Sequence, residues 1–398
     1  MTIPAGYRFV GAECAFKKEG RPDLGLILSE EPAVVAGVFT TNKFQAAPVL
    51  ACKERIAKSP SVRAFLVNSG QANACTGTEG DANCAKTCQM VADLCGIAAA
   101  EVYPSSTGVI GAQLKMDLWE KGALQLAEGL KEEGKSQADA ERVADSILTT
   151  DTVRKMVAAE VQLSGGTVKF LGMAKGAGMI SPNMATMLGF IVCDASVEST
   201  WWQASLSDCI YKSFNAITVD GDTSTNDTIL AMANGASGVQ AESEEDKALL
   251  ARALRDICQD LAYRIVQDAE GGTKVMQVNI SGAGSPEDAE LIARAVGNSP
   301  LVKTALFGED PNWGRIVAAV GRSGAEFDPA KLVLRFGNVV AFEKGCPAQG
   351  DLDALIGPLM QKEHVEINLE LGDGNAEYTL WASDLTKEYI SINADYRT

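Results

Sequence analysis

One threonine in this sequence stands where a hydroxyl nucleophile fits the local pattern. Residues 175–193 read Lys-Gly-Ala-Gly-Met-Ile-Ser-Pro-Asn-Met-Ala-Thr-Met-Leu-Gly-Phe-Ile-Val-Cys, so a loop of small residues leads to Thr186. The apolar run at 187–192 is bounded by turn residues and predicts a buried strand. Thr186 is therefore expected at the lip of a core strand, where a strained peptide bond and a hydroxyl can coexist.

A threonine hydroxyl needs a neighbouring base to become a nucleophile. The only histidine is His364, which lies in the alternating stretch 363–371 and fits an ordinary surface strand. On that interpretation, histidine-based triads and multi-histidine metal sites are excluded. One solution is the α-amino group of Thr186 itself, whose pKa would be about 7.7–8.0 if the bond to Ala185 were cut.

Such a cut has a simple chemical route. The Thr186 hydroxyl attacks the Ala185 carbonyl, the acyl group moves from nitrogen to oxygen, and water opens the resulting ester. The same oxygen is then activated by the amine that it released. The local sequence alone favours the ordinary alternative, a threonine at the start of a strand. Motifs elsewhere in the chain are needed to distinguish a nucleophile from an ordinary threonine.

Acyl transfer also needs hydrogen-bond donors for the developing oxyanion. The best candidates are Thr107, through its hydroxyl, and Gly108, through an approachable backbone N–H. Both lie in the stretch 104–108, Pro-Ser-Ser-Thr-Gly, which we expect to be a polar loop. A plain serine and threonine turn is the alternative.

Two further stretches, 68–77 and 220–228, are dense in short polar side chains. Either could bind a small polar ligand through directed hydrogen bonds, or could be a solvated loop. The sequence Gly-Ala-Gly at 176–178 lacks the spacing of a phosphate-binding loop. No metal site is predicted.

The remaining pattern mixes strands and helices without strict alternation, which predicts an α+β fold in layers. A composition break at 282–286 suggests two domains, 1–282 and 283–398. Residues 1–80 are expected to form short strands separated by turns, and residues 331–398 are expected to be rich in strands with a single helix. Helices are expected at 80–96, 113–131, 136–148, 201–214, 244–270 and 351–361, and largely across 286–322.

Composition narrows the class of protein. A chain of 398 residues exceeds one ordinary core, and its net charge of −17 disfavours nucleic acid and anionic membranes as partners. Neither a secretory signal nor a membrane span is visible. The ten scattered cysteines form no CxxC pair, which favours buried, reduced thiols over metal ligands or disulfides. We therefore expect a cytoplasmic protein.

The junction at 175–188 closely resembles the self-cleaving site of the ornithine acetyltransferase family of arginine biosynthesis. Other segments match that family in the same order over nearly the whole chain, although Gln71 stands where many members have asparagine. These segments are Asn-Ser-Gly-Gln-Ala-Asn-Ala-Cys-Thr-Gly at 68–77, Ser-Thr-Gly-Val-Ile-Gly at 106–111, Asn-Ala-Ile-Thr-Val-Asp-Gly-Asp-Thr-Ser-Thr-Asn-Asp at 215–227, Asp-Pro-Asn-Trp-Gly-Arg at 310–315 and Ile-Asn-Ala-Asp-Tyr-Arg-Thr at 392–398.

The resemblance implies roles for particular residues. Thr186 would be the nucleophile, with cleavage between Ala185 and Thr186 into chains 1–185 and 186–398, assembled as an α2β2 heterotetramer. Thr107 and Gly108 would form the oxyanion hole. The implied fold is the layered α+β arrangement of self-cleaving, DmpA-like enzymes, with a smaller C-terminal domain. The implied substrate-binding residues are Thr152, Lys175, Thr186, Glu270, Asn393 and Thr398.

The implied reaction moves the acetyl group of N-acetylornithine to glutamate through an acetyl-threonine intermediate. Lys175 suits a substrate carboxylate and Glu270 suits an ammonium group, which we take as a hypothesis. No cofactor is expected, but whether acetyl-CoA is also a donor stays open, as does a clavulanate-cluster paralogue. The rival classes are an N-terminal-nucleophile amide hydrolase or aminopeptidase, and an uncleaved binding protein.

Overall fold

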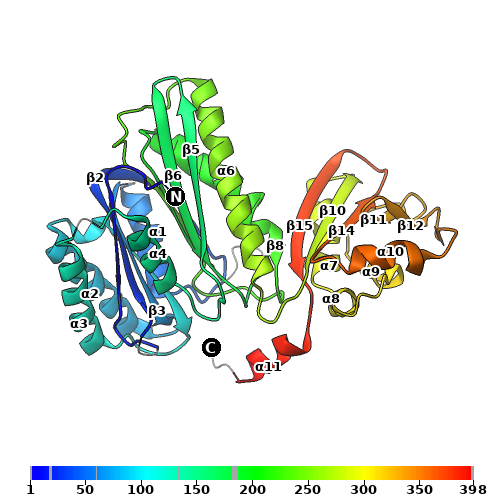
Figure 1. The fold of residues 1–398 in the computed structure, drawn as a ribbon, viewed down its shortest axis with the longest axis horizontal. Helices are drawn as coiled ribbons and strands as arrows, with labels where there is room; N and C mark the ends of the chain where they lie inside the picture. Colours follow the sequence, from blue (N-terminus) through cyan, green and yellow to red (C-terminus); the bar gives the residue numbers. More distant parts are fainter. Residues whose placement is uncertain (1, 18–19, 60, 133, 182–186, 396–398) are drawn as a thin grey trace.

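The molecule is built on two mixed β-sheets, each packed against helices, and Figure 1 shows them side by side. The long helix α6 (Glu244–Gln267) lies between the two sheets. The C-terminal helix α11 (Lys387–Asp395) follows the second sheet and runs back toward the first. This confirms the predicted α+β class. The computed structural model describes residues 2–17, 20–59, 61–132, 134–181 and 187–395.

The first sheet has eight strands, in the order β4-β3-β2-β9-β7-β6-β5, with β1 paired to β2. Its pairs β3–β4 and β7–β9 are parallel and the others are antiparallel. The strands are β1 (Tyr7–Ala12), β2 (Leu24–Phe39), β3 (Ser61–Gln71), β4 (Val102–Val109), β5 (Lys155–Leu163), β6 (Gly166–Lys175), β7 (Leu188–Cys193) and β9 (Thr228–Ala233).

The centre of this sheet is buried on both faces. All six residues of β7 and all six of β9 are buried, as expected when helices cover both sides of a parallel pair. Trp202 and Leu254 pack on one face, and Cys52 and Val143 belong to the core on the other. The helices around this sheet are α1 (Ala47–Lys58), α2 (Gly77–Cys95), α3 (Met116–Gly129), α4 (Gln137–Ser146), α5 (Ser199–Tyr211) and α6, with 3₁₀ turns at Ala99–Glu101 and Phe214–Ala216.

The second sheet has seven strands, in the order β13-β12-β11-β14-β10-β15-β8. Its apolar core lies on one face, under the helices α7 to α10. The elements are β8 (Ile217–Thr218), β10 (Val275–Ala283), β11 (Val333–Phe336), β12 (Val339–Glu343), β13 (Cys346–Pro347), β14 (His364–Glu370), β15 (Ala376–Ser383), α7 (Pro286–Gly297), α8 (Pro300–Phe307), α9 (Trp313–Gly321) and α10 (Leu352–Met360).

Most predicted elements are present, with instructive exceptions. The strand expected at 187–192 is β7, and the helix expected at 244–270 is α6. The polar loop predicted at 104–108 was wrong, because these residues form β4. The helix α1 was missed among residues expected to be strands, and α11 was missed in the C-terminal region. The domain boundary at 282 stays a prediction, and that residue lies within β10 of the second sheet.

Candidate active site

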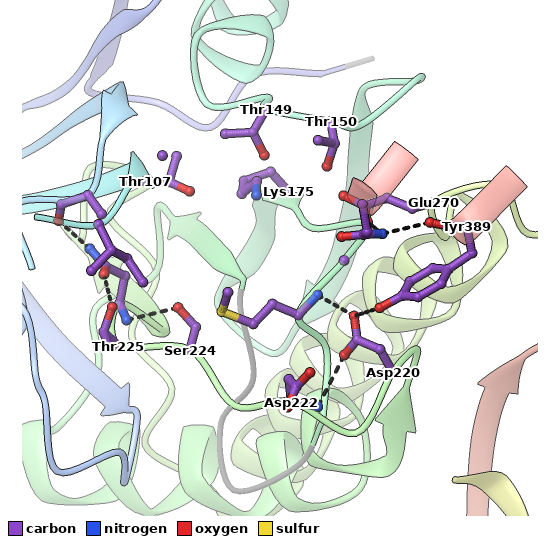
Figure 2. A pocket seen from close by; sticks show the side chains of 17 residues that line it. Thr107, Thr149, Thr150, Lys175, Asp220, Asp222, Ser224, Thr225, Glu270 and Tyr389 are labelled. Atoms are coloured by element: carbon purple, nitrogen blue, oxygen red, sulfur yellow. Dashed lines mark hydrogen bonds between the residues drawn. The ribbon is translucent and has the colours of Figure 1, made fainter. Parts of the chain in front are cut away.

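A cavity of about 230 Å³ lies at one end of the first sheet, where segments distant in the sequence converge. Figure 2 shows its side chains arriving from β4, from the loop after α4, from the end of β6, from the loop after β8, from the turn after α6 and from α11. Lining residues that carry polar or charged groups include Thr107, Thr149, Thr150, Lys175, Asp220, Asp222, Ser224, Thr225, Asn226, Glu270, Tyr389 and Asn393.

One wall is the end of β4, which supplies Thr107 and Gly108. The strand runs parallel to β3, and Gly108 pairs with Gly70. Gly108 has a φ of +130°, and a Cβ there would stand 2.4 Å from the Gly70 carbonyl carbon. Only glycine fits this close approach. Thr107 is buried in the fold and lines the cavity, so its hydroxyl can meet a ligand there.

Asn226 ties that wall to the rest of the cavity. Its Nδ2 donates to the carbonyl of Ser106 at 2.8 Å and to that of Ala72 at 2.5 Å, while its Oδ1 accepts from the Thr225 hydroxyl. The Ser106 hydroxyl in turn donates to Asn68 at 2.6 Å. The two polar stretches at 68–77 and 220–228 are thus joined through β4. Most of their side chains are buried, so they are not solvated loops.

A buried charge cluster supports Lys175 at the end of β6. The Lys155 ammonium donates to Asp151 at 2.8 Å and to Asp268 at 2.6 Å, and Lys175 Nζ lies 3.8 Å from Asp151. Burial alone would raise the pKa of Asp151, but the charges of Lys175 and Lys155 outweigh it and hold that pKa well below its usual value.

Lys175 itself is almost fully buried, and burial lowers the pKa of its ammonium group although Asp151 opposes the shift. An ammonium group has three hydrogen-bond donors. Its ion pair with Asp151 is long, so the ammonium group keeps capacity for an oxygen ligand in the cavity. In Figure 2 the Lys175 side chain is drawn below Thr149, with Thr107 to its left.

Glu270 supplies negative charge on the opposite side of the cavity. Its backbone N–H donates to the Ala177 carbonyl at 2.9 Å, and its carboxylate accepts from Asn393 Nδ2 at 2.8 Å. A Cβ on Gly178 would stand 2.3 Å from the Glu270 carboxylate, so glycine at 178 makes room for it. The contact with Asn393 also fastens α11 to the cavity rim.

Asp220 and Tyr389 complete the same side. The Asp220 carboxylate accepts the backbone N–H groups of Met179 and Ile180 at 2.6 and 2.9 Å, and the Tyr389 hydroxyl at 3.2 Å. Burial raises the pKa of Asp220, although the hydrogen bonds that it accepts oppose the shift. Sequence reasoning missed Tyr389, since the helix α11 that carries it was not expected.

The model of the ArgJ family matches residues 8–398. The chain belongs to the ArgJ family. The arginine biosynthesis bifunctional protein ArgJ of Nitratidesulfovibrio vulgaris is 52% identical over 395 residues, which cover 99% of each chain. Its counterpart from Geobacter sulfurreducens is 48% identical over 397 residues, again 99% of each chain.

A solved structure is also similar. The crystal structure of arginine biosynthesis bifunctional protein argJ from Bacillus halodurans is 37% identical, with a TM-score of 0.50. The match covers 52% of this chain and 98% of that one. These relationships make this ArgJ chain an arginine-biosynthesis acyltransferase, as the resemblance implied.

The ArgJ residues expected from the sequence fall into three groups. Thr107, Gly108, Lys175, Glu270 and Asn393 line the cavity. Ala185, Thr186 and Thr398 lie outside the described residues. The third group is a single residue that lies elsewhere in the structure.

That residue is Thr152, which does not line this cavity. Its hydroxyl and backbone N–H both donate to Asp268, and it borders a separate depression beside α6. Its near neighbours Thr149 and Thr150 line the cavity instead. Asp268 also binds Lys155, so Thr152 contributes to the charge cluster behind Lys175.

The residues that follow the predicted cleavage site lie beside the cavity. Met187 directly follows Thr186 in the chain, and its N–H donates to Asp227 Oδ1 at 2.9 Å. Leu188 pairs with the cavity residue Lys175 on one side and with Thr228 on the other. The strand that begins after Thr186 therefore starts beside the cavity.

Other features of this ArgJ chain agree with a site that does not use histidine. His364 lies on β14 with its Nδ1 3.1 Å from the Tyr263 hydroxyl, and it does not line the cavity.

Seven of the ten cysteines are buried. In the part of the chain that the structure describes, no helix is both long and apolar enough to cross a membrane.

Proposed function

We propose that this chain cuts itself between Ala185 and Thr186 and then transfers the acetyl group of N2-acetyl-L-ornithine to L-glutamate. One observation carries the proposal. Thr107 and Gly108 on β4, Lys175 at the end of β6 and Glu270 after α6 come from three separate parts of the chain. They nevertheless line one cavity beside the strand that begins just after Thr186. Family membership supplies the reaction class.

Cleavage comes first. The Thr186 hydroxyl attacks the Ala185 carbonyl carbon, a C–O bond forms, and the C–N bond breaks to leave an ester. Water hydrolyses the ester, giving a carboxylate on Ala185 and a free amine on Thr186. The solved Bacillus halodurans chain supports this step. The match covers 98% of that chain but only 52% of this one, as expected if the solved chain corresponds to one cleavage product.

Acetyl transfer then uses the same hydroxyl. The α-amino group of Thr186 takes the hydroxyl proton while the oxygen attacks the acetyl carbonyl of acetylornithine. The Thr107 hydroxyl and the Gly108 N–H would donate to the oxyanion. The proton passes to the departing nitrogen, ornithine leaves, and the amine of glutamate attacks the acetyl-threonine ester. This sequence gives ping-pong kinetics.

The opposite charges that line the cavity suit the substrate. Acetylornithine carries a carboxylate and a terminal ammonium group, which match Lys175 and Glu270. Asn393 would fix the orientation of the Glu270 carboxylate through their 2.8 Å hydrogen bond. Glutamate places a carboxylate beside Lys175 in the second half-reaction. Thr398 remains a candidate contact from the C-terminus.

We extend the proposal to acetyl-CoA as a second donor, because the matched relatives are named bifunctional. No cofactor is required by this chemistry. We also propose that the two cleavage products assemble as an α2β2 heterotetramer in the cytoplasm, the compartment expected of a biosynthetic enzyme. Steady-state assays with acetyl-CoA and glutamate test the second donor, and light scattering tests the assembly.

Intact mass spectrometry of the active protein tests the central proposal. Two fragments ending at Ala185 and beginning at Thr186 are expected, and Thr186→Ala should give one uncut chain without acetyltransferase activity. Active wild-type protein in a single piece would overturn the mechanism. An enzyme that hydrolyses acetylornithine at the same rate with and without glutamate would instead be an amide hydrolase.

A further inference from the structure

A buried ammonium group connects the two oppositely charged sides of the cavity. Lys155 lies on β5, where it pairs with Ala174 of β6, and its side chain is fully buried. Its nitrogen donates to Asp151 at 2.8 Å, to Asp268 at 2.6 Å and to the Val153 carbonyl at 3.4 Å. All three donors of the ammonium group are therefore used, which fixes its position.

Asp151 carries this connection to Lys175. One of its oxygens accepts the backbone N–H of Gly176 at 2.7 Å, next to Lys175 in the chain. The other oxygen accepts the N–H of Thr149 at 3.0 Å and lies 3.8 Å from Lys175 Nζ. Lys175 and Thr149 both line the cavity (Figure 2), so a shift of the Asp151 carboxylate would move the group proposed to bind the substrate carboxylate.

Asp268 carries the connection to Glu270. It directly follows α6, and its backbone N–H donates to the Arg264 carbonyl at 3.0 Å. Glu270 comes two residues later, and its own N–H donates to the Ala177 carbonyl at 2.9 Å. Lys155 and Ala177 thus hold the turn after α6 at two points, which keeps the turn from pivoting about either one.

Stability alone does not explain this chain of charges, which we call the charged spacer and which consists of Asp151, Lys155 and Asp268. The side chains of Asp151 and Lys155 are fully buried, and that of Asp268 is 6% exposed. Burying an ion pair removes the hydration of both charges, so well-packed apolar residues can stabilise a fold equally well. What paired charges add is a fixed geometry, because each has to stay within hydrogen-bond reach of its partner.

We propose that the charged spacer sets the distance between Lys175 and Glu270 and thereby selects the length of the donor's side chain. The inference rests on the proposed function, in which Lys175 binds the carboxylate of acetylornithine and Glu270 binds its terminal ammonium group. A donor with one methylene group more or fewer would misplace one of these two charges. The residues of the charged spacer are positioning residues, because none of the three lines the cavity.

The test measures competition between donors that differ in length. Wild-type enzyme receives glutamate and a mixture of N2-acetylornithine, N2-acetyllysine, which is one methylene group longer, and N2-acetyl-2,4-diaminobutyrate, which is one shorter. The product ratios give ratios of kcat/KM, which do not depend on how much of the enzyme is folded. Each change of one methylene group should lower kcat/KM by about 10- to 200-fold relative to acetylornithine.

Two substitutions of Asp268 alter the charged spacer. Asp268→Asn keeps an oxygen for the Thr152 N–H but loses the charge that holds Lys155. The preference for acetylornithine should fall by about tenfold, the lower end of the value of one methylene group. Asp268→Glu keeps the charge and adds a methylene group between α6 and Lys155, so the preference should shift toward acetyllysine.

Asp246→Asn is the matched control. Asp246 is a buried carboxylate at the opposite end of α6 from Asp268, and it accepts the Ser164 N–H at 2.8 Å and the Ser164 hydroxyl at 2.6 Å. It therefore fastens the same helix to the turn between β5 and β6. This variant should keep the wild-type preference among the three donors.

The outcomes separate the inference from the proposed function. Wild-type enzyme that uses the three donors equally well, or Asp268→Asn enzyme with the wild-type preference, would overturn the role of the charged spacer and leave acetyl transfer intact. An equal loss of preference in Asp246→Asn would overturn it too, since any damage to α6 would then suffice. If Asp268→Asn does not fold, Asp268→Glu decides, and an unchanged preference overturns the inference. Wild-type chain that transfers no acetyl group from acetylornithine would instead refute the proposed function.

Discussion

The two sheets of this molecule bury their side chains in different ways. In the first sheet, β7 and β9 are buried along their whole length, because cores on both faces enclose them. In the second, β14 alternates between buried and more exposed positions, since its apolar core lies on one face. A strand enclosed on both faces can place polar groups only at its ends.

The cavity lies where this rule predicts. Lys175, Leu188 and Thr228 mark the ends of three adjacent strands, and the charged and hydroxyl groups collect just beyond them. The second sheet instead uses its more open face for polar side chains. There, Asn279 donates to Asn368 at 2.8 Å and accepts from Thr379 at 3.0 Å. This contrast predicts that damage to the second sheet affects stability, and damage at the end of the first affects chemistry.

The largest expected effect tests the second sheet. Phe336 on β11 is fully buried and pairs with Ile367 across the strands. Phe336→Ala should destabilise this region by about 3–5 kcal/mol, because a large cavity replaces the ring. Thermal unfolding measures the loss, and kcat measured on the folded enzyme should be unchanged.

The neighbouring residue gives the control for that prediction. Arg335 lies on the opposite face and pairs with Glu370 at 3.1 Å in a partly exposed position. Arg335→Ala should change stability by about 1 kcal/mol or less. A fall in kcat for folded Phe336→Ala would contradict the division of roles between the two sheets.

The next effect tests the end of the first sheet. Thr107→Val removes the hydroxyl that faces the cavity and should lower kcat by about 100- to 1,000-fold, as expected for one oxyanion donor. Its thermal midpoint should stay close to that of the wild type. Ser105→Ala on the same strand is the control, because the buried Ser105 hydroxyl has no partner in the described chain and does not line the cavity. Equal kcat values for the two variants would exclude the proposed role of Thr107.

A smaller effect is expected at Glu270, on the opposite side of the cavity. Glu270→Gln keeps an acceptor for Asn393 but loses the charge, and should raise KM for acetylornithine by about 10- to 100-fold, the value of a charged hydrogen bond. A donor that lacks the terminal amino group should be affected much less. Unchanged selectivity between the two donors would show that Glu270 does not bind the ammonium group.

The smallest effect concerns pH. Burial lowers the pKa of Lys175, and lysine loses its positive charge as pH rises through its pKa. KM for acetylornithine should therefore increase a few-fold at an alkaline pH below the ordinary lysine value of about 10.4. Glu270→Gln should show a higher KM with its midpoint at a lower pH, because the Glu270 charge helps to raise the Lys175 pKa. A KM that stays constant until ordinary lysines titrate would mean that Lys175 does not bind the carboxylate.

Local patterns predicted some elements well and others poorly. The strand β7 was found because a short apolar run bounded by turn residues survives any arrangement of its neighbours. The stretch 104–108 was misread as a loop, because proline and small polar residues seldom mark a strand. Its polar side chains are accommodated at the buried end of the sheet, where Asn68 and Asn226 provide hydrogen bonds.

The candidate site shows the same division. The family resemblance implied roles for Thr107, Gly108, Lys175, Glu270 and Asn393, and all five line one cavity. The placement of Thr152 could not be read from the chain, because a hydroxyl turns toward whichever buried carboxylate the fold brings near. Here that carboxylate is Asp268, 116 residues away.

The sequence by itself determined the chemical groups, the family and the core strand that follows Thr186, because residue type, motif order and apolar periodicity are properties of the chain alone. Only the tertiary structure decided which of these groups meet. Pairing between distant strands placed Gly108 against Gly70, and the buried Lys155 joined Asp151 to Asp268. Such contacts depend on long-range packing, which no local pattern encodes.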